Sequence, residues 1–341
     1  MKKVAGVLLK TVFPLVLGVY LIWFLFQSMD EEVKQYFYKA LREANYFWVF
    51  LSLLLSFFAL LSRAYRWKYL LEPMGYKTSF WNRYHAVVIG YIVNLTIPRA
   101  GEATRSGMLY RSDGVPFSKS FGTILAERVF DLIMLLIIAI SASFIGAGDF
   151  WKIKELIEAS FSSSPESSSI IQLIKWIVIG LFLLGFAIVF LVKKIRLKII
   201  GFIKGLISGV LSVFKTKKPF SFLGHTLLIW ILYIVYFGVC FLALPETSTM
   251  NSTGILLAFI AGSLGISLTN GGIGVFPLVV GLVVEYYLKD QYGSQAQGIG
   301  YALGMIIWSS QTLMIILLGL LSFYLLPKNY SKDGDIRENQ E

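Results

Sequence analysis

The sequence predicts an all-α integral membrane protein that crosses the bilayer several times. Apolar residues fill 56% of its 341 positions and aromatic residues 16%, whereas only 15% of the residues are charged. A soluble domain carries about 25% charged residues. The apolar residues also fall in blocks long enough to cross about 30 Å of hydrocarbon. These observations and a short motif that occurs twice predict the fold class.

The motif occurs once in each half of the chain. Asn94–Glu102 reads NLTIPRAGE, and Ser267–Val275 reads SLTNGGIGV. Aligned without gaps, the copies share Leu-Thr and a glycine five residues after the threonine. A helix breaker, Pro98 or Gly271, interrupts each apolar stretch. Broken hydrophobic segments at matching positions in two halves point to the binding site of a transporter.

Six full spans and two broken segments account for the apolar blocks. In chain order they are spans near 7–27 and 45–62, a broken segment over 84–110, spans near 118–146, 170–192 and 221–243, a broken segment over 253–288, and a span near 297–326. The first block is too long for a signal peptide, so we expect it to stay uncleaved. Residues 327–341 form a polar tail.

The loops differ in charge, which predicts the orientation. Loops 63–83 and 193–218 are rich in Lys and Arg, whereas 29–44 and 147–169 mix bases with acids. The first pair is expected to be cytoplasmic and the second pair outside. This assignment requires 84–110 to enter and leave on the cytoplasmic side as a re-entrant hairpin.

The second broken segment then enters from outside, and the two halves are inverted repeats. The repeats cover about 5–146 and 168–326 within a single membrane domain, 1–326. We expect a multi-pass protein of the cell (inner) membrane with both termini cytoplasmic, including the tail. The alternative is two unrelated apolar halves with full spans throughout.

The net charge of +11 follows mostly from this orientation and indicates no nucleic-acid partner. Segment 194–218 alternates lysines with apolar residues at helical spacing. It is predicted to lie on the inner leaflet and to contact anionic headgroups. The alternative is a solvated basic loop. The one cysteine, Cys240, and the distant His85 and His225 indicate no disulfide, metal site or cofactor.

Charged residues inside the membrane are expected to carry function, because burying them is costly. Around the first break, Arg99 and Arg105 could grip a phosphate with their guanidinium forks. A helix that starts after Pro98 would add amide donors, and an exposed Gly101 would let a headgroup approach the backbone. The candidate substrate-binding residues here are Asn94, Pro98, Arg99, Gly101, Glu102 and Arg105.

A second group of charges, Glu127, Arg128 and Asp131, lies in the long span that follows. Glu127 and Asp131 are four residues apart and share one helix face. They could act as acid and base. The alternative, for these charges and for those around the break, is internal ion pairing that locks the hairpin to the long span.

The second break carries exposed backbone instead of charge. Its candidate binding residues are Asn270, Gly271, Gly272 and Gly274, whose amides and carbonyls could face a ligand. The alternative for the glycines is close helix packing, which small residues favour in lipid. Neither half contains a Ser/His/Asp set, so no catalytic residue is assigned.

These residues resemble a known family. The stretch from Asn94 to Arg105, with Ala126–Asp131 (AERVFD), is similar to an N-x-x-x-P-x-x-x-G-E-x-x-R pattern and a downstream E-R-x-x-D pattern. Gly271–Phe276 (GGIGVF) resembles the C-terminal P-G-G-x-G pattern, with Asn270 where proline is common. The family is that of the lysylphosphatidylglycerol synthase transmembrane region, also called flippase-like, and the resemblance covers about residues 5–325.

The resemblance implies a flippase-like protein that moves a lipid with an anionic or modified headgroup between leaflets. The lipid would be a phospholipid, an aminoacyl-phospholipid or a glycolipid. The cytosolic acyltransferase domain of the synthases is not found in this sequence, so their synthase activity is not expected. The alternatives are an intramembrane transferase and an accessory subunit of envelope-lipid synthesis. Membrane lipids, a second copy of the chain and a partner synthase are the candidate partners.

Overall fold

The computed structural model describes residues 29–97, 100–146, 148–149, 218–269 and 271–326, with isolated positions in 16–27 and 197–216. All regular structure in this part of the chain is helical, as predicted. Several predictions fall wholly or mostly outside the described residues: the spans near 7–27 and 170–192, loop 147–169, segment 194–218, the tail 327–341, and Pro98, Arg99 and Asn270.

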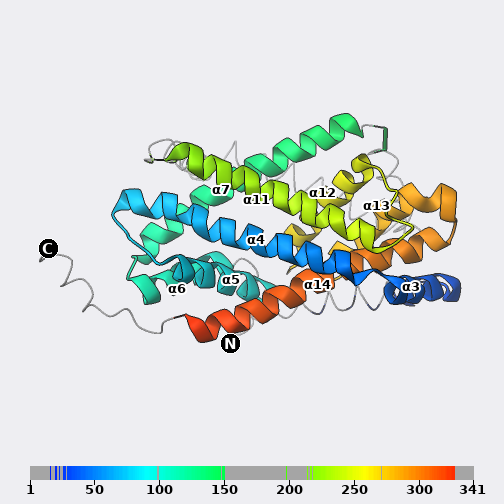
Figure 1. The fold of residues 1–341 in the computed structure, drawn as a ribbon, viewed down its shortest axis with the longest axis horizontal. Coiled ribbons are helices and arrows are strands. Elements are labelled where there is room, and N and C mark those ends of the chain that lie inside the picture. Colours follow the sequence, from blue (N-terminus) through cyan, green and yellow to red (C-terminus); the bar gives the residue numbers. More distant parts are fainter. Residues whose placement is uncertain are drawn as a thin grey trace, which may run out of the picture.

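The helices form one layered bundle whose longest members run along the long axis of the molecule (Figure 1). In chain order the elements are α3 (Glu31–Glu43), α4 (Tyr46–Leu71), η2 (Glu72–Met74), α5 (Phe80–Thr96), α6 (Gly101–Asp113), α7 (Phe117–Ile145), α11 (Pro219–Val239), η3 (Cys240–Ala243), α12 (Ser252–Leu268), α13 (Val275–Tyr292) and α14 (Gln295–Leu325).

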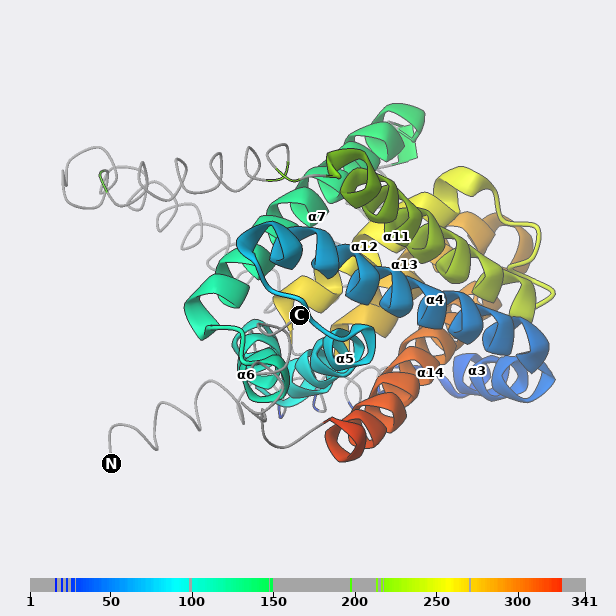
Figure 2. The same ribbon diagram turned by 60° about the vertical axis from the view of Figure 1, so that its left-hand side comes forward.

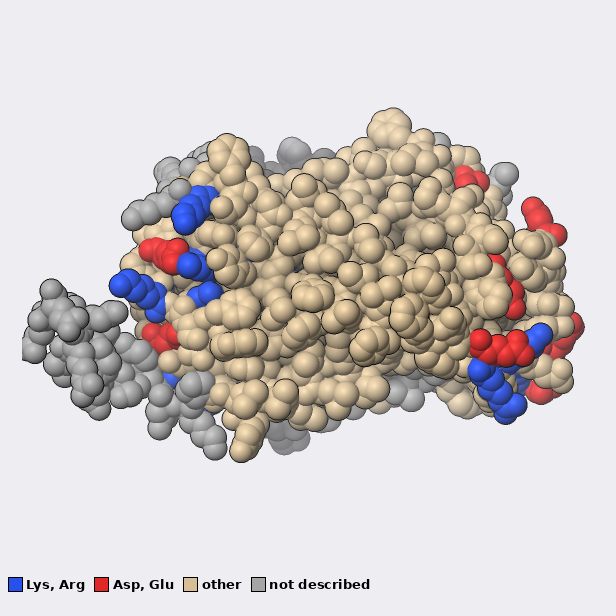
Figure 3. Space-filling view, in the orientation of Figure 1, with Lys and Arg blue, Asp and Glu red and all other residues tan. Residues whose placement is uncertain are grey.

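Four helical segments in the described part are long and apolar enough to cross a membrane. They are Tyr46–Met74, Phe117–Ile145, Pro219–Ala243 and Gln295–Leu325. The surface agrees with this interpretation, because acidic and basic side chains gather at the two ends of the molecule and leave a wide uncharged belt between them (Figure 3). Such a belt matches the hydrocarbon layer of a bilayer. The chain is therefore a membrane-embedded helical protein.

The first predicted break forms a helical hairpin. Helix α5 ends at Thr96, and α6 begins at Gly101. The two helices are antiparallel, since the amide of Ser79, before α5, donates to Asp113 Oδ1 at the end of α6 over 2.9 Å. Near the tip, the Asn94 side chain accepts from the Gly101 amide at 2.7 Å. Asn94 therefore supplies an acceptor to a helix start whose amides have no partner within the helix.

The second predicted break forms another antiparallel hairpin, α12–α13. Gly254, near the start of α12, packs against Tyr287 near the end of α13, and Gly262 packs against Phe276. In the turn between the helices, Gly271, Gly272 and Gly274 have φ values of 61°, 79° and 74°. This left-handed conformation is accessible to glycine without a steric penalty, which explains the glycine-rich break.

The two hairpins start from opposite ends of the bundle and meet at their tips. Helix α7 connects the two ends, because it begins just after α6 and the residue that follows it, Gly146, packs against Thr253 of α12. At the tips, Gly271 packs directly against Leu95. One helix of each hairpin, α5 and α13, packs against α14 (Figure 2). Full inverted repetition of the halves stays a prediction, since it also involves the spans near 7–27 and 170–192.

The structure moves one span boundary and places a helix in one predicted loop. The span expected near 45–62 continues as helix α4 to Leu71, so Arg63 and Arg66 are buried helical residues and not loop residues. Hydropathy predicts an end near residue 62, because arginines are expected to be exposed to solvent and not buried in a helix. The predicted loop 29–44 instead contains helix α3, whose buried residues Val33, Phe37 and Ala40 lie on one face.

The hairpin packing predicts a specific effect at Gly101. A Cβ atom there would collide with the Gly90 carbonyl and the Asn94 side chain, whereas a Cβ at Gly107, also in α6, would meet nothing within 4 Å. Gly101→Ala should destabilise the protein by about 1–3 kcal/mol, as overpacking does. The matched control, Gly107→Ala, should raise stability slightly, because alanine favours helix. Melting temperatures in detergent measure both, and equal shifts would contradict this packing.

Labelling of single cysteines tests the arrangement in the membrane. In a Cys240→Ala background, Glu72→Cys and Ser118→Cys flank the first hairpin, and Asp290→Cys lies at the end of the second. All three native side chains are exposed. A hairpin places positions 72 and 118 on one side of the membrane and position 290 on the other. An impermeant thiol reagent on intact cells should label position 290 alone, and labelling of exactly one of positions 72 and 118 would exclude a re-entrant hairpin.

Candidate functional site

A network of buried charges joins the first hairpin to the bundle. Helix α4 supplies two arginines, α6 an acid and an arginine, and α7 two acids and an arginine. The members are Arg63, Arg66, Glu102, Arg105, Glu127, Arg128 and Asp131. A lone charge inside a membrane protein is costly. These helices can therefore pack together only where the arginines meet the carboxylates.

Asp131 is the anchor for helix α4. Its two carboxylate oxygens accept from Arg63 Nη1 at 2.9 Å and from Arg66 Nη1 at 3.0 Å. Arg66 Nη1 also donates to Thr226 of α11 over 3.0 Å, and its guanidinium lies 5.3 Å from the centre of the Phe222 ring. One carboxylate and one arginine thus connect α4, α7 and α11.

Glu127 is the anchor for the first hairpin. Arg105 of α6 donates to both Glu127 oxygens, over 2.7 and 3.2 Å, and Arg66 approaches the same carboxylate at 3.7 Å. The Arg105 guanidinium also stacks 3.7 Å from the centre of the Trp67 ring. A two-pronged ion pair and contact with an aromatic face both stabilise a guanidinium strongly. Arg105 is therefore held inside the protein.

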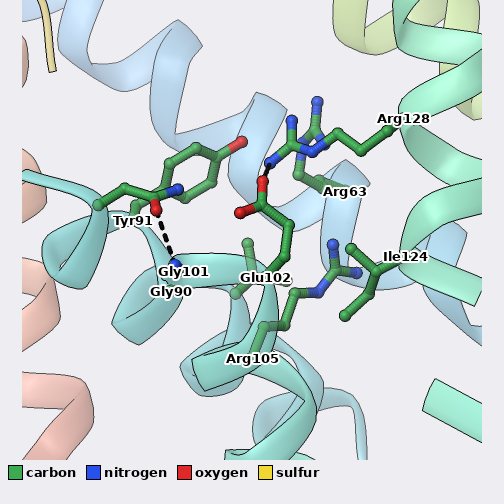
Figure 4. Close-up of a pocket in the computed structure, with 10 residues that line it drawn as sticks. Arg63, Gly90, Tyr91, Gly101, Glu102, Arg105, Ile124 and Arg128 are labelled. Atoms are coloured by element: carbon green, nitrogen blue, oxygen red, sulfur yellow. Dashed lines mark hydrogen bonds and ion pairs between the residues drawn. The ribbon is translucent and has the colours of Figure 1, made fainter. Parts of the chain in front are cut away.

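The outermost pair of the network is different. Arg128 Nη2 lies 2.7 Å from Glu102 Oε1, and the side chains are 41% and 20% exposed. Arg128 also lies 3.8 Å from Asp131. Figure 4 shows the pair, with the Tyr91 ring directed toward it. Arg128 and Glu102 are thus the members of the network that an incoming molecule can reach most easily.

The network carries an excess of positive charge. Four arginines face three carboxylates, so the described residues of the cluster sum to one positive charge. Partial exposure of Arg128 places this excess next to an accessible surface. An anion that binds there would balance the charge of the cluster.

A cavity of about 980 Å³ lies between the tips of the two hairpins and beside the Glu102–Arg128 pair. Its wall combines these two charges with hydroxyl-bearing, amide and aromatic side chains. The larger members are Tyr91, Asn94, Glu102, Arg128, Tyr233, Tyr236, Phe237, Phe259, Phe276, Trp308 and Gln311. Trp308 Nε1 donates to the Gly271 carbonyl at 2.8 Å and so ties the second tip to α14. The cavity can hold a large amphipathic molecule.

The structure separates the candidate residues into groups. Asn94, Glu102 and Gly271 line the large cavity, as does Arg128. Gly272 and Gly274 form the turn but are not part of the lining.

Arg105 and Gly101 lie deeper and border a small space of about 10 Å³. Gly101 is buried against Gly90 and not exposed as expected. Arg105, Glu127 and Asp131 form internal ion pairs, which is the alternative to ligand contact and to acid–base chemistry given above.

Sequence reasoning missed Arg63 and Arg66 as members of the network. A signal was present, because Ser52, Ser56, Ala59, Arg63 and Arg66 recur at helical spacing and continue the buried face of the span before them. The tyrosines Tyr91, Tyr233 and Tyr236 were also missed, since aromatic residues are common in membrane spans and carry no distinctive spacing.

Fold and site together define a class: an all-α membrane protein in which two helical hairpins meet beside a buried charge network. The chain belongs to the family described as the lysylphosphatidylglycerol synthase TM region, which matches residues 11–319. It is also 30% identical over 101 residues to a UPF0104 membrane protein of Methanocaldococcus jannaschii, a segment that covers 29% of this chain and 30% of that relative. No solved structure matches the chain significantly.

Loss of Asp131 should destabilise the fold strongly. Asp131→Asn removes the charge that Arg63 and Arg66 share, and breaking a buried pair costs about 3–5 kcal/mol. The control, Glu72→Gln, removes an exposed acid 3.3 Å from Lys68 and should change stability by about 0.5 kcal/mol or less. Melting in detergent would compare the two, and a small effect of Asp131→Asn would mean that water solvates the network.

Proposed function

We propose that this protein binds a membrane lipid with an anionic headgroup in the cavity and moves it between the leaflets of the cell membrane. One observation carries the proposal: the accessible Glu102–Arg128 pair opens into the 980 Å³ cavity where the two opposed hairpins meet. The family description names synthases of a charged phospholipid, which favours a lipid as the ligand.

Arg128 is the residue proposed to hold the headgroup. Its guanidinium already has one carboxylate partner in Glu102 and a more distant one in Asp131. A phosphate can replace Glu102 because its oxygens match the guanidinium fork equally well. The excess positive charge of the network favours this exchange. Glu102 would then turn toward the cavity, where Tyr91 and Asn94 line the wall.

The hairpins provide the means of transport. They start from opposite ends of the bundle and touch each other through Leu95 and Gly271. Opening one hairpin or the other would expose the cavity to one side at a time, as in transporters built from inverted halves. The apolar part of the wall suits the first carbons of the acyl chains.

An intramembrane transferase is less well supported. Glu127 and Asp131, the candidate acid and base, are bound by arginines and do not line the large cavity. A general acid or base must reach the proton that it transfers. Their positions favour a role in holding the helices together.

Charge removal at Arg128 tests the proposal. Arg128→Gln should lower the transfer of a fluorescent anionic phospholipid in liposomes about tenfold or more, since a hydrogen bond to a charged group is worth about 1.5–3 kcal/mol. The control, Lys119→Gln, makes the same charge change at an exposed position on the same helix and should have no effect. Melting temperatures establish that both variants fold. Equal transfer by the two variants would refute the role of Arg128.

A further inference from the structure

Most polar side chains in the described wall of the large cavity are neutral, although the cavity borders a charge network. Among the described residues that line it, two are charged, Glu102 and Arg128, whereas eleven have neutral hydrogen-bonding side chains. They are Ser56, Tyr91, Asn94, Tyr233, Tyr236, Ser263, Ser267, Thr269, Trp308, Gln311 and Thr312. A headgroup with several charges would leave most of this wall unmatched. One phosphate charge and several neutral polar groups would match it.

Much of the hydrogen-bonding capacity of the wall is still available. Ser263, Ser267 and Thr269 donate to backbone carbonyls within one turn, at 2.8, 3.0 and 3.1 Å, and their oxygens can still accept. Within the described part of the chain, five other hydroxyls make no hydrogen bond: those of Ser56, Tyr91, Tyr233, Tyr236 and Thr312. Groups that both donate and accept suit the hydroxyls of a ligand.

The aromatic rings and the size of the cavity also favour a ligand that is rich in hydroxyls. Phe237, Phe259, Phe276 and Trp308 border it, and the negative face of an aromatic ring attracts the C–H groups on the flat side of a sugar. A volume of about 980 Å³ lies at the upper end of the range for small-molecule sites, about 300–1,000 Å³. A bare phosphate with a short amine would leave most of this space unfilled.

We infer that the lipid carries a polyol headgroup, a sugar or a cyclitol, attached through one phosphate. The inference rests on the proposed function and names its substrate class. Arg128 binds the phosphate, and the hydroxyls of Tyr236 and Thr312 bind those of the ring from α11 and α14. A site built for hydroxyls discriminates strongly against an analogue that lacks them, because its own polar groups are then unpaired.

Three lipids with identical acyl chains provide the test: phosphatidylinositol, phosphatidylglycerol and phosphatidic acid. Each presents a phosphate, and the number of headgroup hydroxyls decreases in that order. Native mass spectrometry of the full chain with each lipid, alone and in competition, measures retention. We expect phosphatidylinositol to be retained at least tenfold more strongly than phosphatidic acid, with phosphatidylglycerol between them.

Two near-isosteric variants test whether hydroxyls of the cavity wall cause the preference for phosphatidylinositol. Tyr236→Phe and Thr312→Val each remove a hydroxyl from the cavity and should reduce the ratio of phosphatidylinositol to phosphatidic acid severalfold, without weakening phosphatidic acid itself. Tyr324→Phe removes a hydroxyl from a side chain that is 84% exposed and serves as the matched control. An unchanged ratio in both cavity variants would overturn the assignment of this wall.

The outcomes separate this inference from the proposed function. If all three lipids bind equally and Arg128→Gln weakens them all, the phosphate site stands and the polyol inference is overturned. If no lipid is retained, or if Arg128→Gln has no effect on any of them, the proposed function fails. A rank order that follows the hydroxyl count, lost in the cavity variants and kept in Tyr324→Phe, supports both.

Discussion

The pairing of buried charges is the constraint on which the rest of this structure depends. Asp131 and Glu127 each accept from arginines of another helix, and the arginines lie at depths where an unpaired charge would be costly. Helices α4, α6 and α7 can therefore pack in few registers. The network holds the first hairpin against the bundle and so fixes the position of its tip, which in turn places the cavity.

The tips themselves depend on small residues. Gly101 packs against Gly90 inside the first hairpin, and Gly271 packs against Leu95 between the hairpins. A side chain at either glycine would separate surfaces that are now in contact. Stability therefore resides in the buried members of the charge network and in the glycine contacts, while the more exposed Glu102–Arg128 pair contributes less to it. Such a division lets the site exchange partners while the scaffold stays intact.

The candidate site was predictable in part. Glu102 and Arg128 were recognisable because charges inside apolar segments are rare, and that reasoning needs no structure. Sequence could not tell that Arg105 is bound by Glu127 while Arg128 faces the cavity, because both arginines lie in similar apolar surroundings along the chain. The roles differ because Trp67 and Glu127 enclose Arg105, whereas the Arg128 side chain is 41% exposed.

The sequence by itself determined the class of protein, the approximate places of the long apolar helices in the described part, and the two breaks. Hydropathy and Pro and Gly positions are local properties, and bilayer thickness and backbone geometry translate them directly into spans and turns. Tertiary structure alone decided that Arg63 and Arg66 belong to the network and that the hairpin tips meet. These facts depend on contacts between residues far apart in the chain. No local pattern encodes which carboxylate an arginine will face.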